Sequence, residues 1–213
     1  MIIYVDGSAL RPGDGTERSP FKTISEAATK ALPGDEVLVA PGIYREAVDP
    51  RNAGTATKRI TYRSAQKGQA HITGSEPVKS WSHVEGNIWK ATIPNGVFSD
   101  YNPFTTLVSG DWFIASMIAH TGDVFLDEKS MYEVTDLEQV KNPLKIQTSW
   151  DPEFSLYTWY TEQDEEKDQT ILYANFQEKD PNRENVEISV RKNCFYPSSE
   201  GIGYITLSGF KIS

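Results

Sequence analysis

Two Pro-Gly pairs place the tightest constraint on what this chain can fold into. In the stretch "LPGDEVLVAPGIYRE", Pro33-Gly34 and Pro41-Gly42 bracket the short apolar run VLVA at 37–40. Proline and glycine interrupt regular structure, so each pair predicts a turn. The run between them is too short for a helix and rich in β-branched residues, which favours a buried strand. A second short strand at 43–44 follows at once, so the fold must accommodate very short strands joined by tight turns.

The segment "TISEAATKAL" at 23–32 predicts a helix just before this pair of strands. Thr23 and Glu26 have the spacing of a capping box. The apolar residues recur at i, i+3, i+4, i+7 and i+8, which forms one stripe. They are Ile24, Ala27, Ala28, Ala31 and Leu32. We expect this helix to cover the open first coil of a stack of strands and to bury Ile24, Ala28 and Leu32, because a stack with an uncovered end exposes its core.

The chain divides into three parts by pattern. Residues 1–80 hold the helix and several short strands, and residues 184–213 return to short strands separated by Asn, Ser and Gly. Residues 81–183 hold longer β-like runs, including "DWFIASMI", "DVFLDEKSMYEV", "SLYTWYTEQ" and "QTILYANF". A short helix is expected at "DLEQVKN", with Asp136 as its cap. The charged stretch "TEQDEEKDQT" is expected to be a solvated hairpin tip or loop.

This pattern predicts a mainly β protein. Short strands, dense turns and a helical cap favour a right-handed parallel β-helix, because each of its coils needs only a few inward side chains per strand. The longer runs at 81–183 favour an antiparallel β-sandwich-like insertion that leaves one coil and returns to the next. Residues 184–213 would then be the return to the β-helix, which ends on an apolar strand at 205–212 and is expected to be truncated.

Composition excludes several function classes. The net charge of −9 and the pI near 4.9 argue against a nucleic-acid partner, because an acidic surface repels phosphates. No apolar stretch is long enough to span a bilayer, and the first residues lack the features of a signal peptide. The expected location is therefore the cytoplasm, or the outside of the cell if a leader was removed. The five Trp and ten Tyr fit sugar stacking as well as core packing.

Few residues carry recognisable chemistry. His71, His83 and His120 lack a metal-ligand spacing, so neither a metal nor a cofactor is expected. Cys194 is the single cysteine, and we expect a buried structural thiol there. Glycoside hydrolysis would need two carboxyl groups held about 5–5.5 Å apart or wider. Pattern alone selects no such pair from the 30 acidic residues.

A family resemblance extends this interpretation. The segment "GDGTERSPFKTISEAATKALPGDEVLVAPGIYRE" resembles the opening of many right-handed β-helix proteins active on polysaccharides, both lyases and glycosidases. Later segments, among them "KRITYRSAQKGQAHITGSEPVKSWSHVEGNIWKATIPNGVFSDYNPF" and "GIGYITLSGFKIS", are similar to bacterial β-xylosidases of glycoside hydrolase family 120. The resemblance covers essentially the whole chain. It implies a β-helix interrupted by a β-sandwich, and a xylo-oligosaccharide or other plant-type saccharide as ligand.

The resemblance also implies which site residues this chain holds. In that family the catalytic carboxylates lie on later coils, so no catalytic residue is expected here and the chain alone should be an inactive fragment. A tryptophan in the matching "GDW" segment lines the sugar site, which in this sequence is Trp112, beside Asp111. The alternatives are a non-catalytic carbohydrate-binding or adhesion module and part of a polysaccharide lyase. A homo-oligomer stays open.

Overall fold

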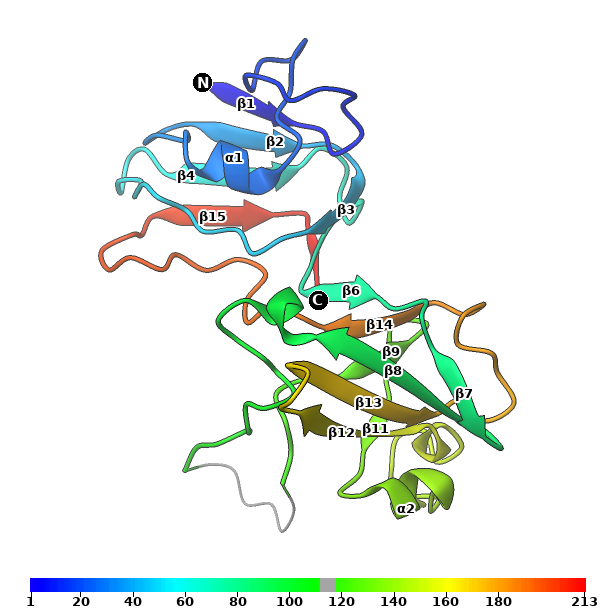
Figure 1. Ribbon diagram of the computed structural model, residues 1–213. Helices are drawn as coiled ribbons and strands as arrows, with labels where there is room; N and C mark the ends of the chain where they lie inside the picture. Colours follow the sequence, from blue (N-terminus) through cyan, green and yellow to red (C-terminus); the bar gives the residue numbers. More distant parts are fainter. Residues whose placement is uncertain (112–117) are drawn as a thin grey trace. The chain divides into compact units, whose positions relative to one another are not determined.

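The chain folds mainly as β-structure, with two short α-helices among the residues described. The structure is a computed structural model that describes residues 1–111 and 118–213. The described chain forms two compact units (Figure 1): residues 1–74 together with 191–213, and residues 75–190. Neither α-helix exceeds five residues, and no helix in the described ranges is long and apolar enough to cross a membrane.

The first unit consists of short strands and one helix. These elements are β1 (Ile2–Val5), α1 (Ile24–Ala28), β2 (Glu36–Val39), β3 (Gly42–Arg45), β4 (Ile60–Ser64), β5 (Ala70–Thr73), β15 (Ile205–Ser208) and β16 (Lys211–Ile212). The strand expected at 37–40 is thus β2, and the strand expected at 43–44 lies within β3. The turn between α1 and β2 contains Gly34 at a φ of 93°, a left-handed conformation that glycine adopts without steric cost.

Two parallel sheets organise this unit. The first has the order β1-β2-β4-β15 and the second the order β16-β5-β3. In the first sheet Val37 lies opposite Tyr62, and Tyr62 lies opposite Leu207. In the second sheet Ile43 lies opposite His71, and His71 lies opposite Lys211. Three successive strand pairs, β2–β3, β4–β5 and β15–β16, therefore each give one strand to each sheet.

The corner between β15 and β16 corrects one sequence expectation. The apolar run at 205–212 was expected to be one strand, but it bends at Gly209, whose φ is 75°. This left-handed conformation suits glycine because it has no Cβ. The bend sends the last two strand residues into the second sheet rather than the first.

Helix α1 follows the predicted capping pattern but ends early. The Thr23 hydroxyl accepts a hydrogen bond from Glu26 N at 3.1 Å, and Glu26 Oε2 accepts one from Thr23 N at 3.0 Å. The prediction that Ile24 and Ala28 are buried is confirmed, since both are at most 1% exposed. The prediction for Leu32 is wrong, because its side chain is 57% exposed. The helix ends at Ala28, and Leu32 lies in the turn before Pro33 rather than on the apolar stripe.

The second unit contains the longer strands. Its elements are β6 (Ser75–Pro77), β7 (Ser82–Glu85), β8 (Ile88–Pro94), the 3₁₀ helix η1 (Asn95–Phe98), β9 (Val124–Leu126), β10 (Lys129–Ser130), β11 (Tyr132–Glu133), α2 (Leu137–Lys141), the 3₁₀ helix η2 (Phe154–Leu156), β12 (Thr158–Asp164), β13 (Gln169–Asn175) and β14 (Val186–Ser189). They form a five-stranded sheet, β11-β12-β13-β8-β7, and a four-stranded sheet, β10-β9-β14-β6. All pairs in these sheets are antiparallel except β11 with β12.

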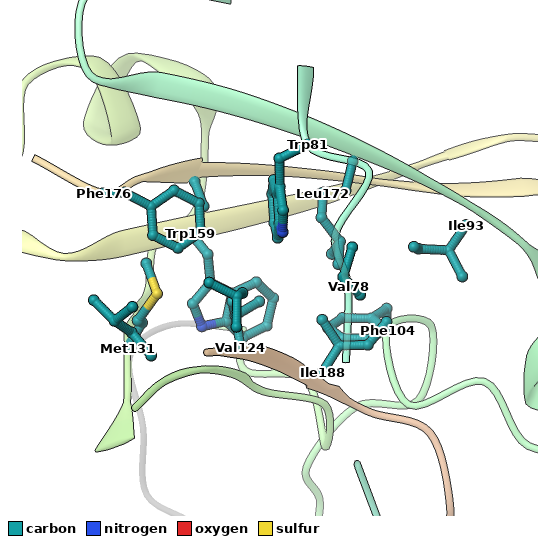
Figure 2. Packing of buried hydrophobic residues seen from close by; sticks show 14 of the residues in the cluster. Val78, Trp81, Ile93, Phe104, Val124, Met131, Trp159, Leu172, Phe176 and Ile188 are labelled. Atoms are coloured by element: carbon teal, nitrogen blue, oxygen red, sulfur yellow. The ribbon is translucent and has the colours of Figure 1, made fainter. Parts of the chain in front are cut away.

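One apolar core joins the two sheets of the second unit. Figure 2 shows Trp159 and Leu172 from the larger sheet together with Val124 and Ile188 from the smaller one. Aromatic rings meet edge to face within this core, with the Phe104 and Trp159 ring centroids 5.6 Å apart. Such pairs add to the stabilisation that comes from burying apolar area. An antiparallel sheet that packs on a core with one face shows alternating buried and accessible residues, as β9 and β14 do.

Two local predictions in this unit are confirmed. Asp136 caps α2, with its Oδ1 accepting a hydrogen bond from Gln139 N at 2.9 Å. The charged stretch at 161–170 spans the tip of the β12–β13 hairpin, where Asp164 lies opposite Gln169. Lys167 Nζ lies 2.7 Å from Asp164 Oδ2, so these two opposite charges pair with each other at the hairpin tip.

The second unit is wider than the range 81–183 expected from the sequence. Strand β14, which was grouped with the closing segment, pairs with β6 and β9 inside the second unit. The return to the first unit begins only at Arg191. Short strands with similar separators look alike in sequence, and only the partner strand decides to which unit each belongs.

Ile24 and Leu32 provide a direct test of this packing. Replacing Ile24, which is fully buried, with alanine should lower the free energy of unfolding by about 2–5 kcal/mol. Leu32→Ala should change it by no more than about 0.5 kcal/mol, because the side chain is already exposed. Urea unfolding of both variants measures the difference, and equal losses would show that the exposed position of Leu32 is incorrect.

Candidate functional site

The structure describes most of the residues selected from the sequence, but not Trp112, and it does not bring them together at one site. Asp111 is an exposed turn residue, and Trp112 lies outside the described residues. His71 Nε2 lies 2.7 Å from Ser213 Oγ in the first unit. His83 lies 2.8 Å from the Gly86 carbonyl and meets Trp89 edge to face. These two histidines therefore have structural partners and do not gather around a common site.

Asp123 is a largely buried carboxyl whose surroundings strongly perturb its ionisation. It lies directly before β9, after Gly122. A Cβ on Gly122 would come within 2.9 Å of the Phe104 ring, so glycine allows this turn to approach the core closely. The main-chain N–H of Asp123 donates to Ser189 Oγ at 3.1 Å, and Val124 N–H donates to Asp123 Oδ1 at 2.8 Å.

Burial raises the pKa of Asp123 to about 6, since a partly desolvated carboxylate loses hydration. Hydrogen bonds from the Ser130 side chain and from Val124 N–H lower the pKa but do not offset the burial. The Trp159 indole N–H also favours the ionised form, although it does not reach regular hydrogen-bond geometry. The nearby Glu133 carboxylate raises the pKa further.

Strand pairing brings Glu133 and Trp159 to this place. Glu133 ends β11 and lies opposite Trp159 in the parallel β11–β12 pair. Glu133 binds His120 twice, since its Oε2 accepts the His120 main-chain N–H at 2.8 Å and its Oε1 lies 2.5 Å from His120 Nδ1. We call Asp123, Glu133 and His120 the Asp123 cluster.

The Asp123 carboxyl is the group of this cluster whose proton exchange is moved toward neutral pH. A carboxyl with a pKa of about 6 is the kind of group that serves as a general acid, as in glycoside hydrolysis. The Glu133 carboxyl is less available to a ligand, because both of its oxygens contact His120. Within residues 1–111 and 118–213, no group of three or more His, Cys, Asp or Glu side chains could hold a metal ion.

Sequence reasoning gave little warning of this cluster. The histidines looked scattered, and Glu133 was one of many acidic residues. The available signal was the Gly122-Asp123 pair directly before an apolar strand, which places an acid at the edge of a core. The residues that perturb Asp123 include Glu133 and Trp159, which come from β11 and β12, and their approach depends on strand pairing that the local pattern does not encode.

Cys194 was expected to be a buried structural thiol, and it is only partly buried. Its Sγ lies 3.0 Å from the Ser213 carbonyl oxygen. Burial raises the pKa of this thiol, so the nucleophilic thiolate is disfavoured.

Comparison with known proteins relates the second unit to a glycoside hydrolase family. Residues 78–188 match the family model described as glycoside hydrolase 120, insertion domain. Residues 6–97 match a model described as a protein of unknown function, DUF1565. An uncharacterized Bacillus subtilis protein, YwoF, is 33% identical over 72 residues, which cover 34% of this chain and 15% of that protein.

A solved structure described as the complex of XylC with xylose matches the entire chain. It is 41% identical, with a TM-score of 0.91 over 100% of this chain. The match covers only 35% of the XylC chain, so this chain spans about a third of the length of that structure.

The raised pKa of Asp123 predicts a pH-dependent cost in stability. At a pH below the unfolded value of 3.8 Asp123 is protonated in both states, and as the pH rises to about 6 only the unfolded state ionises, which lowers stability. The difference of roughly two pKa units corresponds to about 3 kcal/mol. Asp123→Asn should therefore gain stability relative to the wild type as the pH rises from about 4 to about 6, by up to about 3 kcal/mol, and keep that gain above pH 6.

Urea unfolding at several pH values measures this difference. Asp164→Asn is the matched control, because the hydrogen bond from Lys167 lowers the pKa of that carboxyl. A constant gap between wild type and Asp123→Asn across the pH range would contradict the assigned environment of Asp123.

Proposed function

The chain belongs to the glycoside hydrolase 120 family, and we propose that it is the N-terminal portion of a β-xylosidase-type glycosidase acting on xylo-oligosaccharides. The observation that carries this proposal is the match to the XylC structure, at 41% identity over the full length of this chain. The bound xylose belongs to that structure, and it supports a saccharide as the ligand class here.

We propose further that the first unit is the beginning of a right-handed parallel β-helix. Three successive strand pairs stack in parallel register, with β2, β4 and β15 in one sheet and β3, β5 and β16 in the other. A third line of contacts supports this arrangement, because Val48 and Phe195 form a parallel bridge beyond the second sheet. Phe195 follows the second unit in sequence, so the second unit would be inserted within one coil of the helix.

In this proposal the reacting carboxylates lie outside this chain. In the family that the chain resembles they lie on later coils, and this chain spans 35% of the XylC chain. Within the described residues, the Asp123 cluster is a poor catalytic pair because Glu133 is engaged by His120 through both oxygens. A glycosidase needs one carboxyl to donate a proton and a second, accessible one to act as nucleophile or base.

The chain alone should therefore not hydrolyse aryl β-xylosides, whereas a longer protein with the later coils should. Loss of a catalytic pair leaves only residual rates, so the difference should exceed about a thousandfold. Release of nitrophenol from an aryl xyloside measures both proteins. Turnover by the purified chain would place a catalytic pair within residues 1–213 and make Asp123 the first candidate. Saccharide binding without hydrolysis by the longer protein would instead support a carbohydrate-binding module.

Trp112 and Asp111 are proposed to contact the sugar. Asp111 is accessible, and Trp112 follows it outside the described residues. An indole can stack on a xylose ring while its N–H forms a hydrogen bond. In the longer enzyme, Trp112→Ala should weaken xylobiose binding by about tenfold or more, in line with loss of a stacking contact. Its melting temperature should stay nearly unchanged, and calorimetric titration together with a thermal scan measures both quantities. A large drop in melting temperature with unchanged affinity would assign Trp112 to the core.

A further inference from the structure

A polar pocket lies in the second unit where the β7–β8 turn, the end of α2 and the end of β13 meet (Figure 1). It is lined by residues 85–88, Lys141, Asn142 and Asn175, and we call it the β7–β8 pocket. Its volume of about 560 Å³ lies within the range of small-molecule sites. All of its lining residues belong to the second unit and to the described part of the chain.

Hydrogen bonds hold the elements around this pocket together. The Phe176 N–H donates to the Asn87 carbonyl at 3.2 Å, which fixes the β7–β8 turn beside the end of β13. Asn175 Nδ2 donates to the Val140 carbonyl at 2.9 Å, which fixes α2 beside the same strand. The pocket is therefore formed by the fold itself, and a ligand would not have to order its walls.

Asn175 leaves a buried donor at this pocket. The residue is 3% exposed, and its Oδ1 accepts hydrogen bonds from Gln177 N and Nε2 at 2.9 Å each. A side-chain amide has two donor hydrogens. Apart from the Val140 carbonyl, no acceptor for Asn175 Nδ2 is present in the described part of the chain. A buried donor without an acceptor costs free energy, so a ligand oxygen placed beside it would be stabilising.

Lys141 supplies a second donor. Its Nζ lies 3.1 Å from Glu85 Oε1 and 3.3 Å from Glu138 Oε1. An ammonium group has three donor hydrogens, so one remains for a ligand after these two contacts. Hydrogen bonds to Glu85 and Glu138 raise the pKa of Lys141, so the group is charged at neutral pH.

The rim of the pocket also offers acceptors. The Glu85 carboxylate contacts Lys141 through Oε1, which leaves its second oxygen available. The Asn87 side chain is exposed, and its amide can both donate and accept. A saccharide hydroxyl likewise donates one hydrogen bond and accepts others, so it matches a lining in which donors and acceptors lie together.

We propose that the β7–β8 pocket is a saccharide subsite that binds a neutral pyranose through Asn87, Lys141 and Asn175. The charges of Glu85, Glu138 and Lys141 leave one negative charge, which favours a neutral sugar over an anionic one. The proposal rests on the proposed function for the choice of xylose units as the ligand. It assigns binding to this pocket and no step of hydrolysis.

NMR spectroscopy of the chain tests the site with xylobiose as the probe. The side-chain amide signals of Asn87 and Asn175 should shift on addition of xylobiose and saturate in the millimolar range, as expected for a few hydrogen bonds formed in water. Amide signals at the tip of the β12–β13 hairpin should stay in place. An unshifted Asn175 side-chain amide would overturn the proposal.

Two variants remove lining groups without reaching the core. Asn87→Ala and Lys141→Gln should each raise the Kd for xylobiose about fivefold, through loss of one hydrogen bond. Lys167→Gln is the matched control and should bind like the wild type, because Lys167 also pairs with a carboxylate three residues away, that of Asp164. Equal Kd values in all three variants would place the bound sugar outside the pocket and contradict the proposal.

Glucuronate tests the preference for a neutral ligand, because it is a xylose ring with an added carboxylate. It should bind at least about fivefold more weakly than xylose, since its charge is repelled by the negative rim. Binding of glucuronate as tight as that of xylose would show that the pocket does not select a neutral pyranose.

Hydrolysis by the longer protein separates this proposal from the proposed function. A longer protein that leaves an aryl xyloside intact would show that the proposed function has failed, and the NMR shifts would still decide whether the subsite exists. Hydrolysis together with an unshifted Asn175 amide would remove the subsite alone.

Discussion

The architecture depends on the hydrogen bonds that join the two ends of the inserted second unit. Ser75 lies opposite Ser189 in the β6–β14 pair, and the Arg191 N–H donates to the Gly74 carbonyl at 3.0 Å. The chain therefore leaves the first unit and returns to it at one place. Hydrogen bonds hold the two ends of the insertion together. The length of the insertion therefore adds little to the entropy cost of folding the first unit. The parallel sheets of the first unit can then continue in register from β4 to β15 and from β5 to β16.

The packing of the two sheets also shapes the chemistry of the second unit. The two sheets pack around a core that contains Trp159, and polar residues reach the rim of that core where strands begin or end. Asp123 lies at such a rim, before β9, with a carboxyl that burial leaves reluctant to ionise. Glu133 lies at another, at the end of β11, and uses its charge to hold His120. Two acids a short distance apart in sequence thus have different roles because their surroundings differ.

The tryptophans illustrate how far composition can be interpreted. Their number fitted both core packing and sugar stacking. Trp81 and Trp159 are at most 4% exposed and fill the core of the second unit, whereas Trp150 is fully exposed. Trp112, the one assigned to the sugar by family resemblance, lies outside the described residues. The count of aromatic residues therefore carried no functional information, and the proposed sugar contact depends on the family relationship.

The sequence by itself determined the local elements. Pro-Gly pairs set the limits of β2, the capping box started α1, and Asp136 capped α2, because each signal acts within a few residues. Residues distant in sequence were decided only by the tertiary structure. Pairing assigned β14 to the second unit, and the early end of α1 left Leu32 in water. The environment of Asp123 is of the same kind, since its neighbours Glu133 and Trp159 meet through the β11–β12 pairing. Burial and pairing are properties of the folded neighbourhood, and a local pattern records only which residues are suited to them.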